Sequence, residues 1–292
     1  MGTSSMYKGP SGNSLLPSDF EDPLLTDDMD CNEEEHQENE GKQNDDINSD
    51  VDSNSTDSTN ESESSNENIS NKDAWRNAKS FMSRIASGNS SNYRRGLSSY
   101  VKAYGGASKA AKSASSGTKT TVSLGRFISS AYGANVRNVL EGYKIDYEGR
   151  SAVDILSELI NFIAPIPVTK EDSIARKALI RTMEKLYELI EDENNDISTL
   201  EKIDKEVLDK IIPIQIESYI YERLLNDLGY RIETNSETPS NAIKLEKEIK
   251  EYIQAVVETT LKGNDFSNFE FMEKEVQSLY NQCYLVMEDM TI

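Results

Sequence analysis

Apolar residues recur at helical spacing throughout the second half of the chain. Ser151 precedes the run AVDILSELINFIA, with Asp154 three residues on, and Thr169 precedes a stripe made of Ala175, Leu179, Met183, Leu186 and Ile190. Ser and Thr suit the start of a helix, because their hydroxyl oxygens accept a hydrogen bond from a first-turn N–H. Strand-like alternation is scarce. The pattern predicts an all-α protein, with about five helices in an acidic domain over residues 145–292.

Proline, glycine and serine predict the boundaries of these helices. Pro213 should separate a helix near residues 203–212 from another that stops at Gly229. Ser240 should cap a long helix that Gly263 closes. A last helix should carry an apolar stripe that consists of Met272, Val276, Leu279, Cys283 and Val286.

Residues 73–144 show the same spacing with smaller side chains, and they are predicted to form a helical segment. Asp73 can cap a first helix whose apolar residues are Trp75, Phe81, Met82 and Ile85. A second stripe consists of Leu97, Tyr100, Val101 and Tyr104. A third consists of Val122, Phe127, Ile128, Ala131 and Tyr132, and Val136, Val139 and Leu140 can continue it.

The N-terminal quarter differs from both helical parts. Residues 27–72 hold almost no large apolar side chains, so they cannot bury enough surface to offset chain entropy, and we predict a disordered acidic linker. Residues 1–26 instead space Tyr7, a Gly9-Pro10 turn, a Leu16-Pro17 pair and further leucines among small residues. Such a peptide is predicted to be a short linear motif, read by another protein and carried on a long tail.

Charge divides the chain in the same way. The net charge is -17 over residues 1–73, +11 over residues 74–144 and -15 over residues 145–292, which gives -21 in total. Such asymmetry indicates interaction. We expect the basic segment to complement acidic surfaces of this chain or of a partner. The alternative is a nucleic-acid-binding adaptor, in which Arg and Lys contact phosphates and the interleaved Tyr residues stack on bases.

The composition excludes several kinds of enzyme. The single histidine, His36, lies in the acidic tail, which argues against a histidine-based active site or a zinc site. The pairs Glu184–Glu188 and Glu217–Tyr221 have i,i+4 spacing, but nothing else in the sequence converges on them. We therefore predict a protein that is not an enzyme and has no catalytic residue, metal or cofactor.

The remaining features predict a cytoplasmic protein. The chain has no apolar run long enough to span a bilayer and no apolar secretory signal at its start. Its two cysteines, Cys31 and Cys283, are expected to be free thiols in a reducing compartment.

Several short motifs resemble the B component of the Qat anti-phage defence systems. They are Gly2-Thr3-Ser4, Tyr7, Gly9-Pro10 and Leu16-Pro17 in the opening, then Arg94-Arg95-Gly96-Leu97 and Gly125-Arg126-Phe127 in the basic segment. The resemblance covers about the first 25 residues and residues 90–140, and the rest by architecture only. It implies a bacterial defence protein without a catalytic site of its own. Its partners would be an ATPase, a relative of 7-cyano-7-deazaguanine synthase and a TatD-like nuclease.

This resemblance gives the opening peptide a chemical role. Removal of Met1 would expose the α-amine of Gly2, and an α-amine, with a pKa of about 7.7–8.0, is partly neutral and nucleophilic near neutral pH. We expect the synthase-like partner to modify this amine. N-myristoylation is a poorer explanation, because Met6 stands where that signal needs Ser or Thr. The expected partner-binding residues are Thr3, Ser4, Tyr7, Gly9, Pro10, Leu16, Pro17, Arg94 and Arg95.

Overall fold

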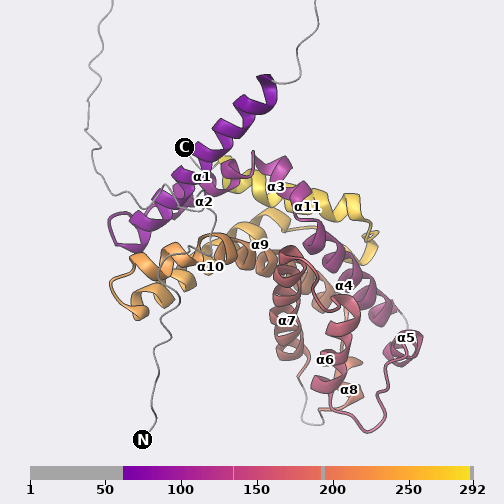
Figure 1. Ribbon diagram of the computed structural model, residues 1–292. Helices are drawn as coiled ribbons and strands as arrows, with labels where there is room; N and C mark the ends of the chain where they lie inside the picture. The colour runs from indigo at the N-terminus through magenta and orange to yellow at the C-terminus, as the bar shows by residue number, and fades with distance from the viewer. Residues whose placement is uncertain (1–61, 134, 192–194, 290–292) are drawn as a thin grey trace, which may run out of the picture. The chain divides into compact units, whose positions relative to one another are not determined.

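The computed structural model describes residues 62–133, 135–191 and 195–289, with side chains from residue 72 onward (Figure 1). Every regular element in these residues is a helix, which confirms the all-α prediction. The elements are α1 (Ser62–Ala86), α2 (Tyr93–Ala103), α3 (Ala107–Ser113), α4 (Ser115–Gly133), α5 (Val136–Gly142), α6 (Ala152–Ile163), α7 (Lys170–Ile190), α8 (Ile197–Leu200), α9 (Lys205–Asn235), α10 (Pro239–Leu261), the 3-10 turn η2 (Phe266–Asn268) and α11 (Glu273–Asp289). None of these helices is long and apolar enough to cross a membrane.

Helix α9 is the element around which the described helices pack. It contacts α1, α4, α7 and α10 (Figure 1). Its ten residues from Gln215 to Leu224 are all buried, so neighbouring helices cover every side of this stretch. One continuous cluster of buried side chains, from Met82 in α1 to Met287 in α11, joins the whole set. The described helices accordingly belong to one compact unit.

Pro213 lies inside α9, so the prediction that it separates two helices is wrong. A proline in a helix interior costs about 3 kcal/mol, because it lacks the N–H that would bond to the carbonyl four residues earlier. Here the apolar residues before and after it, Leu208, Ile212 and Ile216, are fully buried in one stripe. Burial of each such side chain is worth about 1.5–3 kcal/mol, so packing on both sides outweighs the local cost.

Three other predicted boundaries are also wrong. Helix α1 begins at Ser62 rather than after Asp73, since a helix held by packing can extend outward by one hydrogen bond per residue. Helix α9 continues through the buried Gly229 to Asn235, because Ile232 extends the buried stripe. Thr238 caps α10 in place of Ser240 and leaves Pro239 in the first turn, where its missing N–H has no cost.

Local signals are accurate where the cap is strong. The Asp154 N–H donates to the Ser151 hydroxyl oxygen at 3.1 Å and begins α6 as predicted. Thr169 and Asp172 form a reciprocal capping box at the start of α7.

Cys283 is a buried free thiol in α11.

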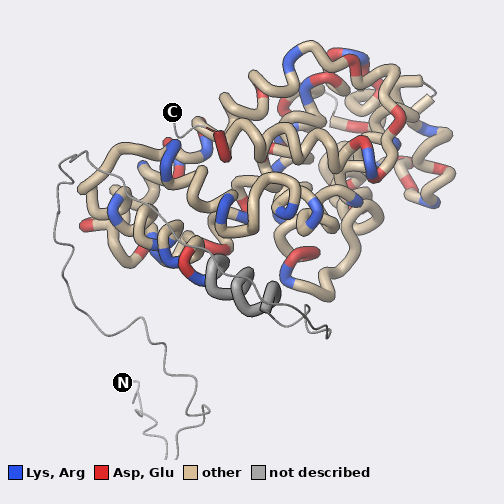
Figure 2. The backbone as a smooth tube through the Cα atoms, turned by 90° about the horizontal axis from the view of Figure 1, so that it is seen from above, with Lys and Arg blue, Asp and Glu red and all other residues tan. Residues whose placement is uncertain are grey.

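The basic segment packs against the acidic helices that follow it. Helices α2 and α3 contact α11, and α4 contacts α7, α9 and α11. Many of the polar contacts come from hydroxyl or backbone donors rather than from Lys and Arg: Tyr93 donates to Glu248, the Ala107 N–H donates to Glu288 at 2.8 Å, and Ser116 donates to Asp172 at 2.7 Å. Arg137 pairs with Glu201 at 2.8 Å. Acidic and basic positions are interspersed along the described helices (Figure 2).

The Gly125-Arg126-Phe127 motif fixes the segment before α11 onto α4. The Phe271 ring lies so close to Gly125 that a Cβ atom there would overlap it. Arg126 donates to the Phe271 carbonyl oxygen at 3.0 Å, and Phe127 is fully buried. All three residues of the motif therefore have a structural use.

Gly125→Ala should destabilise the protein by about 1–3 kcal/mol, because the new methyl group overpacks the contact with Phe271. Gly133→Ala is the matched control in the same helix, since a Cβ there meets nothing within 4 Å. Its effect should be within about 1 kcal/mol. Urea denaturation of both variants measures the difference, and equal stabilities would contradict the assigned contact.

Candidate binding sites

The predicted site residues fall into two groups. Those of the opening peptide lie outside the described residues: Gly2, Thr3, Ser4, Tyr7, Gly9, Pro10, Leu16 and Pro17. Arg94 and Arg95 lie in the first turn of α2 and are exposed.

The Arg94-Arg95-Gly96-Leu97 motif joins α2 to two other helices. The Arg95 guanidinium lies over the Phe81 ring of α1 at 4.8 Å from its centre. Arg94 hydrogen-bonds the Tyr252 hydroxyl of α10. A Cβ atom at Gly96 would lie 2.9 Å from the Ile85 side chain, so glycine permits the close approach of α1 and α2. The two arginines support this packing while their exposed parts remain accessible to a partner.

The double variant Arg94→Glu/Arg95→Glu reverses two exposed charges, so it should weaken association with the partner proteins at least tenfold. A tenfold loss of affinity corresponds to ~1.4 kcal/mol of binding free energy. Loss of the ring contact and the tyrosine hydrogen bond should lower the free energy of unfolding by only about 1–2 kcal/mol. Co-purification and urea denaturation of the same preparations separate the two effects.

DNA binding supplies the opposing outcome for this variant. Phosphate contacts lose affinity steeply as salt rises. We expect weak DNA binding by the wild-type protein even at low salt. Tight, salt-dependent binding that disappears in the double variant would instead favour the nucleic-acid-binding adaptor.

A buried arginine joins the basic segment to α9. The Arg223 side chain is 2% exposed. Its guanidinium donates to the Ala110 carbonyl at 2.9 Å and to the Ser113 hydroxyl at 2.7 Å, both in α3. It also lies over the Tyr104 ring of the α2 C-cap, at 4.1 Å from the ring centre, with its Nε 3.9 Å from a Glu171 oxygen. The guanidinium also donates to the Tyr284 hydroxyl of α11 at 3.4 Å, so five elements meet at this one cation.

Asp227 extends this network by one turn of α9. It accepts hydrogen bonds from the hydroxyls of Tyr100 at 3.0 Å and Tyr104 at 2.5 Å. Lys170 pairs with its other oxygen at 3.1 Å. Burial, followed by the nearby charges, raises the pKa of Tyr100 well above its usual value, so this hydroxyl stays protonated and donates. Two tyrosines of the basic segment, Tyr100 and Tyr104, are therefore used in contacts within the protein.

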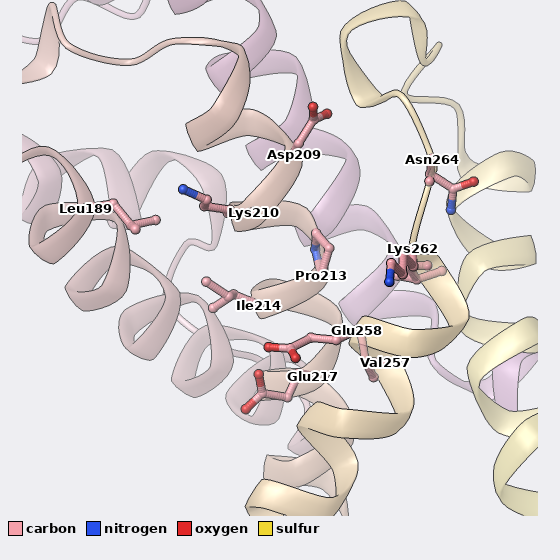
Figure 3. Close-up of a pocket in the computed structure, with 12 residues that line it drawn as sticks. Leu189, Asp209, Lys210, Pro213, Ile214, Glu217, Val257, Glu258, Lys262 and Asn264 are labelled. Carbon is pink, nitrogen blue, oxygen red and sulfur yellow. The ribbon is translucent and has the colours of Figure 1, made fainter.

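A pocket of about 630 Å³ lies beside the proline of α9 (Figure 3). Its walls come from the end of α7, the first half of α9, the end of α10 and the turn after α10. The apolar walls are Leu189, Pro213, Ile214, Val257 and Leu261, and the polar residues are Asp209, Lys210, Glu217, Glu258, Lys262 and Asn264. This volume is in the range of small-molecule and side-chain binding sites.

Glu217 is the most unusual residue of the pocket. It is only 6% exposed, yet its carboxylate makes no hydrogen bond or ion pair with any side chain that the structure describes. Burial raises the pKa of Glu217 to about 7, against the opposing effect of the Lys250 charge. The Glu217 oxygens are not among the fully buried, unpartnered side-chain atoms of the described residues, so they face the pocket, where a ligand could form a hydrogen bond with them.

Other charges around the pocket are either paired or more exposed. The Glu217 and Glu258 carboxylates lie next to each other and face the same space (Figure 3), and the charge of the exposed Glu258 adds to the rise in the Glu217 pKa. Asp209 accepts the Phe266 N–H at 3.1 Å, and Lys210 pairs with Glu206 at 3.5 Å. Among the described residues, no group of three or more His, Cys, Asp or Glu side chains could hold a metal ion, either in this pocket or elsewhere.

The sequence contained partial signals for both sites. The i,i+4 spacing of Glu217 and Tyr221 is one such signal, but the residues that complete the pocket come from α7 and α10, which spacing within one helix does not reveal. Arg223 lies directly before Leu224 and three residues after Ile220, so at helical spacing it is next to apolar residues. A charged residue among apolar neighbours at helical spacing indicates a buried polar network.

Comparison with known protein families gives a match for this chain. The model of a family described as "Qat anti-phage system associated protein QatB" matches residues 105–287, which run from the turn before α3 into α11. No curated protein matches the chain, and no solved structure does.

Proposed function

Since the chain belongs to the QatB family, and so to the components of the Qat anti-phage system, we propose that it is a non-catalytic subunit. In this proposal a partner enzyme that resembles 7-cyano-7-deazaguanine synthase binds its N-terminal peptide and covalently modifies Gly2. The observation that carries the proposal is the opening peptide itself. It places a small glycine behind Met1 and follows it with aromatic, proline and leucine positions quite unlike the acidic tail.

The chemistry requires an amine that is nucleophilic at neutral pH. The partner's relatives use ATP to activate a carboxyl group. The neutral α-amine of Gly2 would attack the activated carboxyl carbon of a 7-deazaguanine acid, and a C–N bond would form. The activating group would leave with its oxygen, and the nitrogen would lose a proton to give an amide. Lysine competes poorly, since its pKa near 10.4 leaves it almost fully protonated.

The separation of Gly2 from the helical unit supports the same reading. The first described residue is Ser62, so about 60 residues join it to the acceptor. A linker of that length with the predicted disorder would have a root-mean-square extension of about 40–45 Å. The opening peptide would thus reach a partner's pocket while the helical unit is bound elsewhere, and the single tether raises its local concentration there.

Intact-mass measurement after co-expression tests the proposal. The chain should gain the mass of one deazaguanine acyl group when the synthase-like partner and the nucleobase precursor are both present. Omission of either should leave the unmodified mass. An unmodified chain in the complete system would contradict covalent modification and leave the opening as a docking motif.

A further inference from the structure

The pocket between α7, α9 and α10 has a combination of features that the proposed function does not use. It has apolar walls, a volume of about 630 Å³ and a buried carboxylate without a partner. The N-terminal modification needs none of them, because the acceptor there is Gly2. The pocket therefore raises a separate question about its ligand.

We propose that this pocket binds an aliphatic cation, namely the side chain of a lysine or arginine that a partner protein inserts between α7, α9 and α10. The methylene stem would pack against Pro213, Ile214 and Val257, and the cationic head would meet Glu217. Long basic side chains bury their stems against apolar surface in this way. The charge-assisted hydrogen bond to Glu217 would supply the partner that this buried group lacks.

Charges of both signs face Glu217. On α10, Glu258 adds negative charge beside it, while Lys250 supplies the strongest of the opposing positive charges. On α7, Arg181 and Lys185 act in the same direction as Lys250. None of these basic groups forms an ion pair with Glu217, and Arg181 pairs with Glu222 instead.

The two nearest alternatives fit the pocket less well. An anionic ligand would have to approach both Glu217 and Glu258. A calcium ion takes six to eight oxygen ligands, whereas this pocket has two adjacent carboxylates and a third, Asp209, that already accepts the Phe266 N–H.

Isothermal titration of the full-length protein with n-hexylamine, hexan-1-ol and hexanoate tests the ligand class. The three probes share a six-carbon stem and differ in charge. We expect hexylamine to bind at least tenfold more tightly than either of the others. Affinity should rise between pH 6 and pH 8, because hexylammonium stays charged while Glu217, with its pKa of about 7, becomes ionised.

Glu217→Gln should abolish both the preference for the amine and the pH dependence. Glu184→Gln, an exposed carboxylate of α7 outside this pocket, is the matched control and should bind like the wild type. Equal binding of hexanol and hexylamine, absence of hexylamine binding, or unchanged binding in Glu217→Gln would each overturn the proposal.

Co-purification with the other Qat components tests the source of the cation. Glu217→Gln should weaken this association, while Glu184→Gln should not. If hexylamine binds through Glu217 but association is unchanged, then the pocket takes a free amine and the partner assignment is wrong. The result does not depend on Gly2, so the mass of the N-terminus in the same preparations tests the proposed function separately.

Discussion

Gly2→Leu should eliminate both the covalent adduct and the protection of cells against phage. Leucine is too large to allow removal of Met1, so the α-amine would belong to a different residue and lie one position further from Tyr7. The acceptor nitrogen would then be displaced from the partner's reactive carboxyl group, and amide formation depends on that placement. Plaque assays and intact mass measure the two effects in the same strain.

Two further variants make this result specific. Gly2→Ala keeps a small residue behind Met1 and should retain most of the adduct. Tyr7→Ala should reduce modification through weaker peptide binding, while the helical unit stays folded because residue 7 lies outside it. If the Gly2→Leu protein carries no adduct and still protects cells fully, then modification of Gly2 is not required for protection.

Arg223→Ala should destabilise the helical unit by about 3–5 kcal/mol, the largest folding effect that we expect of a single residue. The substitution removes the guanidinium donors to the Ala110 carbonyl and the Ser113 hydroxyl, which leaves the carbonyl only the Ser113 hydroxyl as a side-chain donor, and it removes the cation over Tyr104. A loss of this size is a large part of the 5–15 kcal/mol that stabilises a typical domain. Circular dichroism during thermal unfolding should show a markedly lower midpoint.

Controls separate the buried network from charge alone. Arg84→Ala removes an exposed arginine and should change stability by less than about 1 kcal/mol. Tyr104→Phe removes the hydroxyl and its hydrogen bonds with Asp227 and Tyr100 but keeps the ring under Arg223, so its cost should be about 1–2 kcal/mol. An Arg223→Ala protein as stable as Arg84→Ala would show that the network contributes little.

The sequence predicted those parts of the fold that local chemistry decides. Ser151 and Thr169 start helices because each side chain satisfies a nearby backbone N–H, whatever the rest of the protein does. The helix ends predicted at Pro213 and Gly229 are wrong for the opposite reason. Their local preference is to end a helix, but burial of the apolar residues around them outweighs it, and burial depends on α4, α7 and α10.

The candidate sites divide in the same way. A short motif identifies Arg94 and Arg95 as site residues. Their contacts with Phe81 and Tyr252 depend on how three helices pack, which the motif does not predict. The sequence around Glu217 is that of an ordinary charged helix face. Its place in a pocket depends on packing against α10, which contributes Val257. Charge patterning revealed that the basic segment interacts, and the structure shows many of its tyrosine and serine hydroxyls bonded to acidic residues.

The most direct test of the central claim is mass spectrometry of the N-terminal peptide from cells that are fully protected. The preparation should contain the whole Qat system and an infecting phage that it stops. The account predicts that Met1 is absent and that the α-amine of Gly2 carries a deazaguanine acyl group through an amide bond. A free Gly2 amine in that same protected preparation would contradict the account.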